Sequence, residues 1–243
     1  MSYGLYLYGI LPDSKTPDLA LEGLDKQPVQ TQIVDGFTFL YSDAQQERYL
    51  ASRKNLLGHE KVLEQAMHAG YRSLLPLQFG LTIADWQTVA EQLTHPYGDK
   101  LRQLFQILDG NREVGVKVFW EADQELQQLM AENPILQAQR DSLEGKHLSM
   151  DEIVRIGQAI ERAMEQRKQA IITAFREALN EVAIAIVEND SLTESMIYNA
   201  AYLIPWDSEP AFSQLVETLD QQFNSRLKIR YNNFTAPFNF VQF

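Results

Sequence analysis

The sequence predicts an α+β protein with two domains, and three observations support this prediction. Runs suited to strands occur in both halves of the chain, separated by segments with helical periodicity. The turn cluster Asp109-Gly110-Asn111 lies near the midpoint of the 243 residues, directly before the apolar strand Glu113–Trp120. The hydrophobic share of 45% is enough for a core in each half. We expect an N-terminal α+β domain over residues 1–111 and a C-terminal domain over residues 112–243.

The N-terminal domain is expected to begin with three strands. Tyr3–Ile10 alternates residues that suit the two faces of a pleated strand. Val29–Val34 and Phe37–Ser42 flank Asp35-Gly36. This dipeptide favours a tight hairpin, because both turn positions tolerate a positive φ.

Helical periodicity then dominates the rest of the first half. It covers Asp43–Gly70, where Gly58 is a candidate division between two helices. An apolar, extended stretch follows at Arg72–Phe79 and contains a proline that suits a sheet edge or a strand end. Two further helices are expected, one over Thr82–Leu93 with the threonine as its cap, and one over Pro96–Leu108.

The second half predicts one long helix with a well-marked start. After the strand Glu113–Trp120, shorter helical pieces lie on both sides of Asn133-Pro134. Ser149–Glu152 then forms a capping-box signature, in which the serine hydroxyl and the glutamate carboxylate satisfy amide donors at the helix start. Apolar residues recur at three- to four-residue steps from Ile153 to Leu179. This stripe is typical of a helix that faces a core, and less often of one that faces a partner.

The order of the remaining elements predicts the fold of the C-terminal domain. We expect strands at Val182–Val187, Ser195–Ile204 and Arg226–Tyr231, and a helix carrying Phe212–Phe223. The half therefore has the order strand, helices, strand, strand, helix, strand. This is the βαββαβ order of a ferredoxin-like domain with an enlarged helical crossover.

The tail, residues 235–243, lies outside this count of elements. Its apolar residues are Phe238, Phe240, Val241 and Phe243. They make it too apolar for a freely solvated terminus, so we expect it to dock on its own domain or on another molecule.

Composition excludes several classes of function. The chain has 21 basic and 33 acidic residues, a formal net charge of -12, so its average surface would repel a nucleic-acid backbone. It has no cysteine, which excludes disulfides, thiol nucleophiles and thiolate metal sites. No apolar run approaches the roughly 20 residues of a spanning helix. We expect a cytoplasmic protein that is not integral to a membrane.

The chemical inventory contains no recognisable reactive site. Phosphate loops, dinucleotide fingerprints, nucleophile elbows and the metalloprotease motif are absent from the sequence. His59 begins the last of these motifs, but Leu63 occupies the second ligand position. The four histidines, which have no ligand-like spacing, are His59, His68, His95 and His147. We therefore predict no catalytic residues, no cofactor-binding residues, no cofactor and no metal site.

Six separated segments occur in the order that is found in one known family. They are Tyr6–Ile10, His59 with Val62 and Leu63, Leu74–Gly80, Glu113–Trp120, Asn199–Pro205 and Pro237–Val241. With these segments the chain resembles the GvpF/GvpL family of gas vesicle proteins, in particular its cyanobacterial-type F members. There are two departures. Gln78 replaces a residue that is commonly basic in the family, and the tail lacks a fuller Gly-Pro-Trp-Pro-Pro run.

The resemblance implies a non-enzymatic accessory or minor structural protein, located in the gas vesicle within the cytoplasm. It implies that the partners are the small hydrophobic shell subunit, of the GvpA type, and other accessory proteins of vesicle assembly. We add the hypothesis that exposed apolar elements of an otherwise acidic body bind this subunit. The candidate partner-binding residues are Phe234, Pro237, Phe238, Phe240, Val241 and Phe243.

The alternative function is a two-domain α+β enzyme or small-molecule-binding protein. Two small domains can clasp a metabolite in a cleft between them. The candidate residues, chosen by chemical type alone, are His59, Arg53 and Tyr202. The absence of nucleophile, metal and phosphate motifs argues against this alternative, and fold alone does not establish it.

Overall fold

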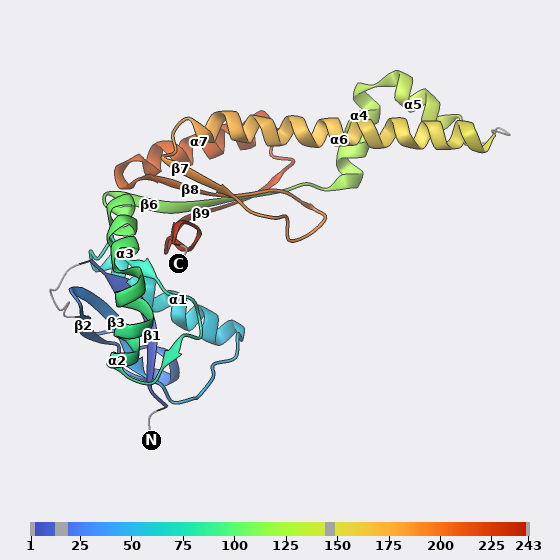
Figure 1. Ribbon diagram of the computed structural model, residues 1–243. Helices are drawn as coiled ribbons and strands as arrows, with labels where there is room; N and C mark the ends of the chain where they lie inside the picture. Colours follow the sequence, from blue (N-terminus) through green and yellow to red (C-terminus); the bar gives the residue numbers. More distant parts are fainter. Residues whose placement is uncertain (1–2, 13–18, 144–148, 242–243) are drawn as a thin grey trace. The chain divides into compact units, whose positions relative to one another are not determined.

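The computed structural model describes residues 3–12, 19–143 and 149–241, and it contains two β-sheets with associated helices (Figure 1). The chain divides into two compact units. Unit 1 combines Met1–Val114 with Tyr202–Glu209 and Asn232–Phe243, whereas unit 2 combines Gly115–Ala201 with Pro210–Tyr231. The expected mixed class of helices and sheets is confirmed. The domain division after residue 111 stays a prediction.

The sheet of unit 1 is antiparallel and is centred on its first strand. Its strands are β1 (Leu5–Leu11), β2 (Gln30–Val34), β3 (Phe37–Asp43), β4 (Leu75–Pro76) and β5 (Thr82–Ile83). The order is β2-β3-β1-β4, and β5 also pairs with β1. The predicted hairpin is confirmed, because Asp35 and Gly36 have φ of 50° and 84° and connect β2 to β3. Two positive φ values in succession match the twist of the flanking strands.

The helices of unit 1 differ from the predicted ones in their boundaries. They are α1 (Arg53–His68), α2 (Trp86–Val89) and α3 (His95–Leu108), together with the 3-10 turn η1 (Leu24–Lys26) and the π-helical segment η2 (Ala90–Thr94). The predicted helical start at Asp43 is wrong, because the Ser52 side chain caps α1 by accepting a hydrogen bond from the Asn55 amide. Gly58 does not divide α1. A Cβ there would lie 2.8 Å from Leu24 Cδ2, so glycine allows η1 to approach the helix.

The predicted helix start at Thr82 is also wrong. Thr82 belongs to β5, where it is paired with Tyr6 of β1. Asp85 is the cap instead, and its Oδ1 accepts hydrogen bonds from the amide and the hydroxyl of Thr88, both at 2.8 Å. From Trp86 to Leu108 the chain is helical without a break, so the two helices predicted here are continuous.

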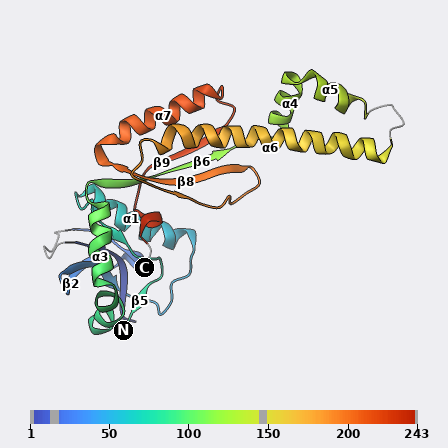
Figure 2. The ribbon, with the colours of Figure 1, turned by 45° about the horizontal axis from the view of Figure 1, so that its top comes forward.

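The second sheet has the strand order β7-β8-β6-β9. Its strands are β6 (Asn111–Phe119), β7 (Ala185–Glu188), β8 (Met196–Pro205) and β9 (Lys228–Thr235), and the helices of this half are α4 (Ala122–Glu132), α5 (Pro134–Asp141), α6 (Met150–Asn180) and α7 (Glu209–Gln222). Within unit 2, α6 and α7 lie over the same face of the sheet (Figure 2). Phe175 of α6 fixes this layer, because its ring lies 6.2 Å from Tyr198 of β8 and 6.1 Å from Phe223, which follows α7.

Helix α6 begins with the predicted capping box. The Ser149 hydroxyl accepts a hydrogen bond from the Glu152 amide, and the Glu152 carboxylate accepts one from the Ser149 amide. Only the second half of its apolar stripe is deeply buried, through Ile171, Phe175 and Leu179. The middle of the helix packs on α4 and α5, and Ile153 near its start is 42% exposed. Within the described ranges, no helix has the length and apolar character needed to cross a membrane.

A buried carboxylate holds the helical crossover of unit 2 in place. Glu125 of α4 is 2% exposed, and its Oε2 accepts hydrogen bonds from Arg167 Nε of α6 at 2.6 Å and from Arg226 at 2.7 Å. Arg167 also contacts the exposed Glu132 at 2.6 Å. One carboxylate thus joins α4, α6 and the residues that precede β9. We call the arrangement of Glu125, Arg167 and Arg226 the two-arginine clamp.

We predict that Glu125→Gln lowers the free energy of unfolding by about 3 kcal/mol, because it leaves two guanidinium groups facing a neutral side chain. Urea unfolding followed by circular dichroism measures the change. Glu132→Gln is the matched control, with an expected loss below about 1 kcal/mol, since the Glu132 side chain is exposed to solvent. Equal losses for the two variants would show that Glu125 is not the anchor.

Candidate functional site

The described part of the tail docks on unit 1, to which it belongs. β9 extends to Thr235, beyond the predicted strand end at Tyr231, and the tail then forms the 3-10 turn η4 (Phe238–Phe240). Ala236 has no exposed surface and Pro237 is buried. The tail was expected to dock on its own domain, residues 112–243, or on another molecule, whereas these residues pack with the core that N-terminal residues form in unit 1. Phe243 lies outside the described residues.

Phe234 is turned toward the core of unit 1. Its ring stacks on that of His68 from α1, with centroids 3.9 Å apart and planes 8° from parallel. Trp206 meets it edge-on at 6.1 Å, and the Arg112 guanidinium lies 5.3 Å from its centre. These contacts give Phe234 a packing role, because both faces and edges of aromatic rings attract such neighbours.

A buried carboxyl group holds the tail turn. Glu113 of β6 is 3% exposed, and its two oxygens accept hydrogen bonds from Asn239: Oε2 from the amide nitrogen at 2.9 Å and Oε1 from Nδ2 at 2.6 Å. Burial raises the pKa of Glu113 to about 7, although the hydrogen bonds from Asn239 act in the opposite direction. Removing the carboxyl group would leave two tail donors without this acceptor, so the contact determines where η4 lies.

Beside the tail turn there is an open groove of about 720 Å³, which we call the tail groove and whose lining residues are mostly aliphatic or aromatic. It is lined by Pro76, Leu77, Gln78, Leu81, Leu93, Tyr97, Phe238 and Val241. Tyr97 and Phe238 are 38% and 37% exposed. Gln78, the position at which the resemblance implies a basic residue, is part of this lining. The groove therefore presents aromatic and aliphatic side chains to solvent with little charge.

One wall of the tail groove is fixed by a buried hydrogen-bond chain. The Gly80 amide donates to the Tyr6 hydroxyl at 3.1 Å, which donates to His59 Nδ1 at 2.9 Å. His59 Nε2 donates to the Leu77 carbonyl at 3.1 Å. Burial lowers the pKa of His59 to about 4, so the ring is neutral and carries its proton on Nε2. Because Leu77 lines the groove, this chain connects its wall to β1 and α1.

Two of the three residues proposed for a small-molecule site are buried. His59 is 2% exposed and uses both ring nitrogens within the core. Tyr202 has no exposed surface, whereas Arg53 is exposed at the start of α1. Among the residues that the structure describes, no group of three or more His, Asp or Glu side chains is arranged to hold a metal ion.

Sequence reasoning missed the carboxyl group that positions the tail and the part of the groove lining that Leu81, Leu93 and Tyr97 supply. Glu113 and Asn239 lie 126 positions apart, and no local pattern connects them. Leu93 and Tyr97 were expected only as ordinary helix residues. The apolar character of the tail and the run containing Leu77 were the available signals, and both lead to the same groove.

We predict that Glu113→Gln changes the pH dependence of stability. The pKa of Glu113 is about 7 in the fold against 4.5 unperturbed, so its stabilising effect is complete below pH 4.5 and is lost as the pH rises through 7. His59 acts oppositely. Its pKa of about 4 lies below 6.5, so its effect is present above pH 6.5 and is lost as the pH falls through 4.

The variant should therefore gain stability relative to the native chain by roughly 1 to 3 kcal/mol as the pH rises from about 4.5 to 7. Urea unfolding at several pH values in this window measures the difference. Glu47→Gln, which changes an exposed carboxyl group, is the control. It should show the same dependence of the unfolding free energy on pH as the native chain. If the unfolding free energies of Glu113→Gln and the native chain change in parallel with pH, Glu113 does not titrate in this range.

Comparisons with known proteins agree over the whole chain. Residues 4–242 match the family model described as "Gas vesicle synthesis protein GvpL/GvpF". The chain is 60% identical to "Gas vesicle protein F" of Dolichospermum flosaquae over 242 residues, which cover 100% of this chain and 99% of that protein.

Two solved structures have the same architecture. The crystal structure of the gas vesicle protein GvpF from Anabaena sp. has a TM-score of 0.90 and 57% identity, covering 100% of this chain and 99% of that one. The GvpF structure from Microcystis aeruginosa has a TM-score of 0.84 and 54% identity, covering 100% of both chains.

Proposed function

Because this chain belongs to the GvpL/GvpF family of gas vesicle proteins, we propose that it is a non-enzymatic accessory or minor structural protein that binds the hydrophobic shell subunit, of the GvpA type, during vesicle assembly. The tail groove is the observation that supports this proposal. We place the protein in the gas vesicle within the cytoplasm, with other accessory proteins as further partners.

The chemistry of the tail groove suits a hydrophobic partner. An exposed concavity whose lining is mainly aliphatic and aromatic gains free energy by removing a partner's apolar surface from water. The formal net charge of -12 makes the average surface of the chain acidic, which keeps a complex with an aggregation-prone subunit dispersed. The proposed role therefore combines an apolar contact with a solubilising body.

The tail residues divide into two roles in this proposal. Phe238 and Val241 contact the shell subunit, because they line the groove. Phe234 and Pro237 position the tail, because they pack on unit 1. Phe240, half-buried within η4, supports the turn. Phe243 remains a proposed contact at the end of the chain.

We also propose that residues 112–243 form a ferredoxin-like domain with an enlarged helical crossover and the apolar tail. The strand order β7-β8-β6-β9 supports this assignment, since the first strand of the unit lies between the third and the fourth. The succession of β6, α6, β7, β8, α7 and β9 along the chain also supports it. Such a scaffold provides binding surfaces and supplies no reactive group.

We expect Phe238→Ser to weaken binding of the shell subunit at least tenfold, that is by about 1.4 kcal/mol or more, because it removes one of the two exposed aromatic rings of the groove. Quantitative co-purification with a tagged shell subunit measures the effect. Phe238→Leu should restore most of the binding, since it returns apolar area. Leu192→Ser is the control, because Leu192 is 71% exposed and belongs to unit 2.

Thermal unfolding of the same variants separates binding from folding. Phe238 is partly exposed, so its substitution should change the free energy of unfolding by less than about 1 kcal/mol. Truncating the tail would be less informative, because it would also delete the buried Ala236 and Asn239, which donates hydrogen bonds to Glu113. Normal binding by a folded Phe238→Ser protein would contradict the proposed contact.

A further inference from the structure

We infer that the outer edge of β9 and the groove between β9 and α7 bind an extended segment of another protein chain, which adds to the sheet of unit 2 as a further strand. The side chains of this segment would be apolar or basic toward α7 and acidic on the opposite face. This surface is distinct from the tail groove, and it uses only the part of β9 that belongs to unit 2, Lys228–Tyr231.

The first observation is the position of β9 in the sheet. Among the described residues, the strand order ends at β9, which pairs with β6 on one side and with no strand on the other. The edge of a sheet is a template for strand addition, in which main-chain hydrogen bonds supply affinity and side-chain pockets supply specificity.

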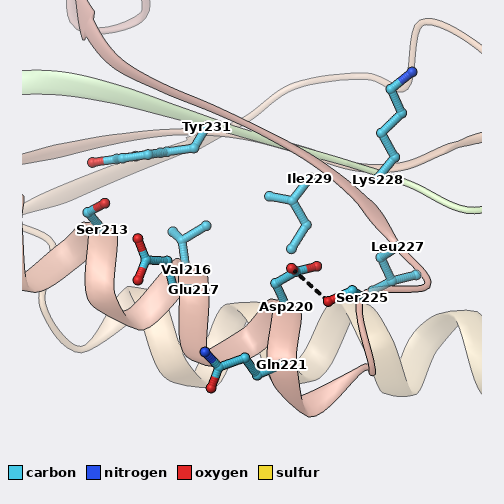
Figure 3. Close-up of a pocket in the computed structure, with 10 residues that line it drawn as sticks. All are labelled: Ser213, Val216, Glu217, Asp220, Gln221, Ser225, Leu227, Lys228, Ile229 and Tyr231. Atoms are coloured by element: carbon cyan, nitrogen blue, oxygen red, sulfur yellow. Dashed lines mark hydrogen bonds between the residues drawn. The ribbon is translucent and has the colours of Figure 1, made fainter.

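The second observation is a groove beside this edge, which we call the edge groove. It has a volume of about 680 Å³ and is lined by residues of α7, of β9 and of the segment that connects them (Figure 3). Val216 and Leu227 are buried at its base, and Ile229 and Tyr231 point from β9 toward α7. An added strand would bury its α7-facing side chains among these four residues.

Acidic side chains lie beside the apolar base of the edge groove. Glu217 is exposed on α7, and Asp220, one turn further along, accepts a hydrogen bond from the Ser225 hydroxyl at 3.2 Å (Figure 3). A lysine or arginine at the rim would complement them, so the α7 side of the occupant should combine apolar and basic residues.

The opposite face of β9 has the opposite charge. Lys228 points away from α7 (Figure 3), and Arg230 lies on the same face as Lys228 because strand residues alternate. The Arg230 guanidinium lies 4.9 Å from the ring centre of Phe119 on β6. Two cations on a protein of formal charge -12 favour an occupant that is acidic on this face.

The same charges disfavour a second copy of this chain as the occupant. Antiparallel pairing of two β9 edges would place Lys228 and Arg230 opposite the same residues of the other copy, at about 4.5 to 5.5 Å between Cβ atoms. Like charges directly across a sheet are destabilising. The pattern therefore favours a different chain with alternating charge.

Synthetic peptides of about eight residues test the inference with the full chain. The matched peptide has valine and lysine at alternate positions and glutamate and threonine between them. The mixed peptide has the same composition, with lysine and glutamate on both faces. We expect the matched peptide to bind and the mixed one to bind at least about fivefold more weakly. When the matched peptide is bound, alternate amides of Lys228–Tyr231 should exchange their hydrogens with solvent more slowly.

Charge reversal on α7 provides the matched pair of variants. Glu217→Lys should weaken binding of the matched peptide at least about fivefold. Glu177→Lys, the same change on the exposed surface of α6, should leave that binding unchanged. Equal affinity for the two peptides, or unchanged exchange in β9, would overturn the inference. Protection of β9 that depends on protein concentration without peptide would also overturn it, because the occupant would then be a second copy.

Discussion

The tail groove depends on one buried contact between segments that are far apart in sequence. Glu113 accepts two hydrogen bonds from Asn239, and this fixes the turn that presents Phe238. A carboxyl group with 3% exposure is costly to bury unless its oxygens are satisfied, so the arrangement strongly favours one position of the tail. Phe234 adds to this through its stacking on His68, so that an apolar terminus becomes an ordered surface.

Unit 2 uses the same principle for a different purpose. In the two-arginine clamp one buried carboxylate, Glu125, binds both Arg167 and Arg226. These contacts hold the helical crossover against α6. In both units a buried acidic group specifies an arrangement that apolar packing alone would leave less defined. An acidic protein with few reactive groups thus uses carboxyl groups for positioning, and its apolar surfaces remain available for partners.

Local signals in the sequence predicted the elements that depend on neighbouring residues. The turn at Asp35 and the capping box at Ser149 were predicted correctly, because each depends on residues within a few positions. The start of the first helix was wrong, because apolar spacing before Ser52 does not create a cap. The groove was only half predicted. The tail residues were recognised as apolar, but the contacts of Glu113 and Tyr97 depend on tertiary structure that periodicity does not encode.

The central claim is that the tail groove contacts the shell subunit. Tyr97 lies on α3 within the groove lining, so replacing it with a photo-crosslinking amino acid tests the claim without altering the tail. We expect irradiation during co-expression to produce a covalent adduct with the shell subunit from position 97, and none from the exposed position 192. Adducts from position 192 together with none from position 97 would contradict the account.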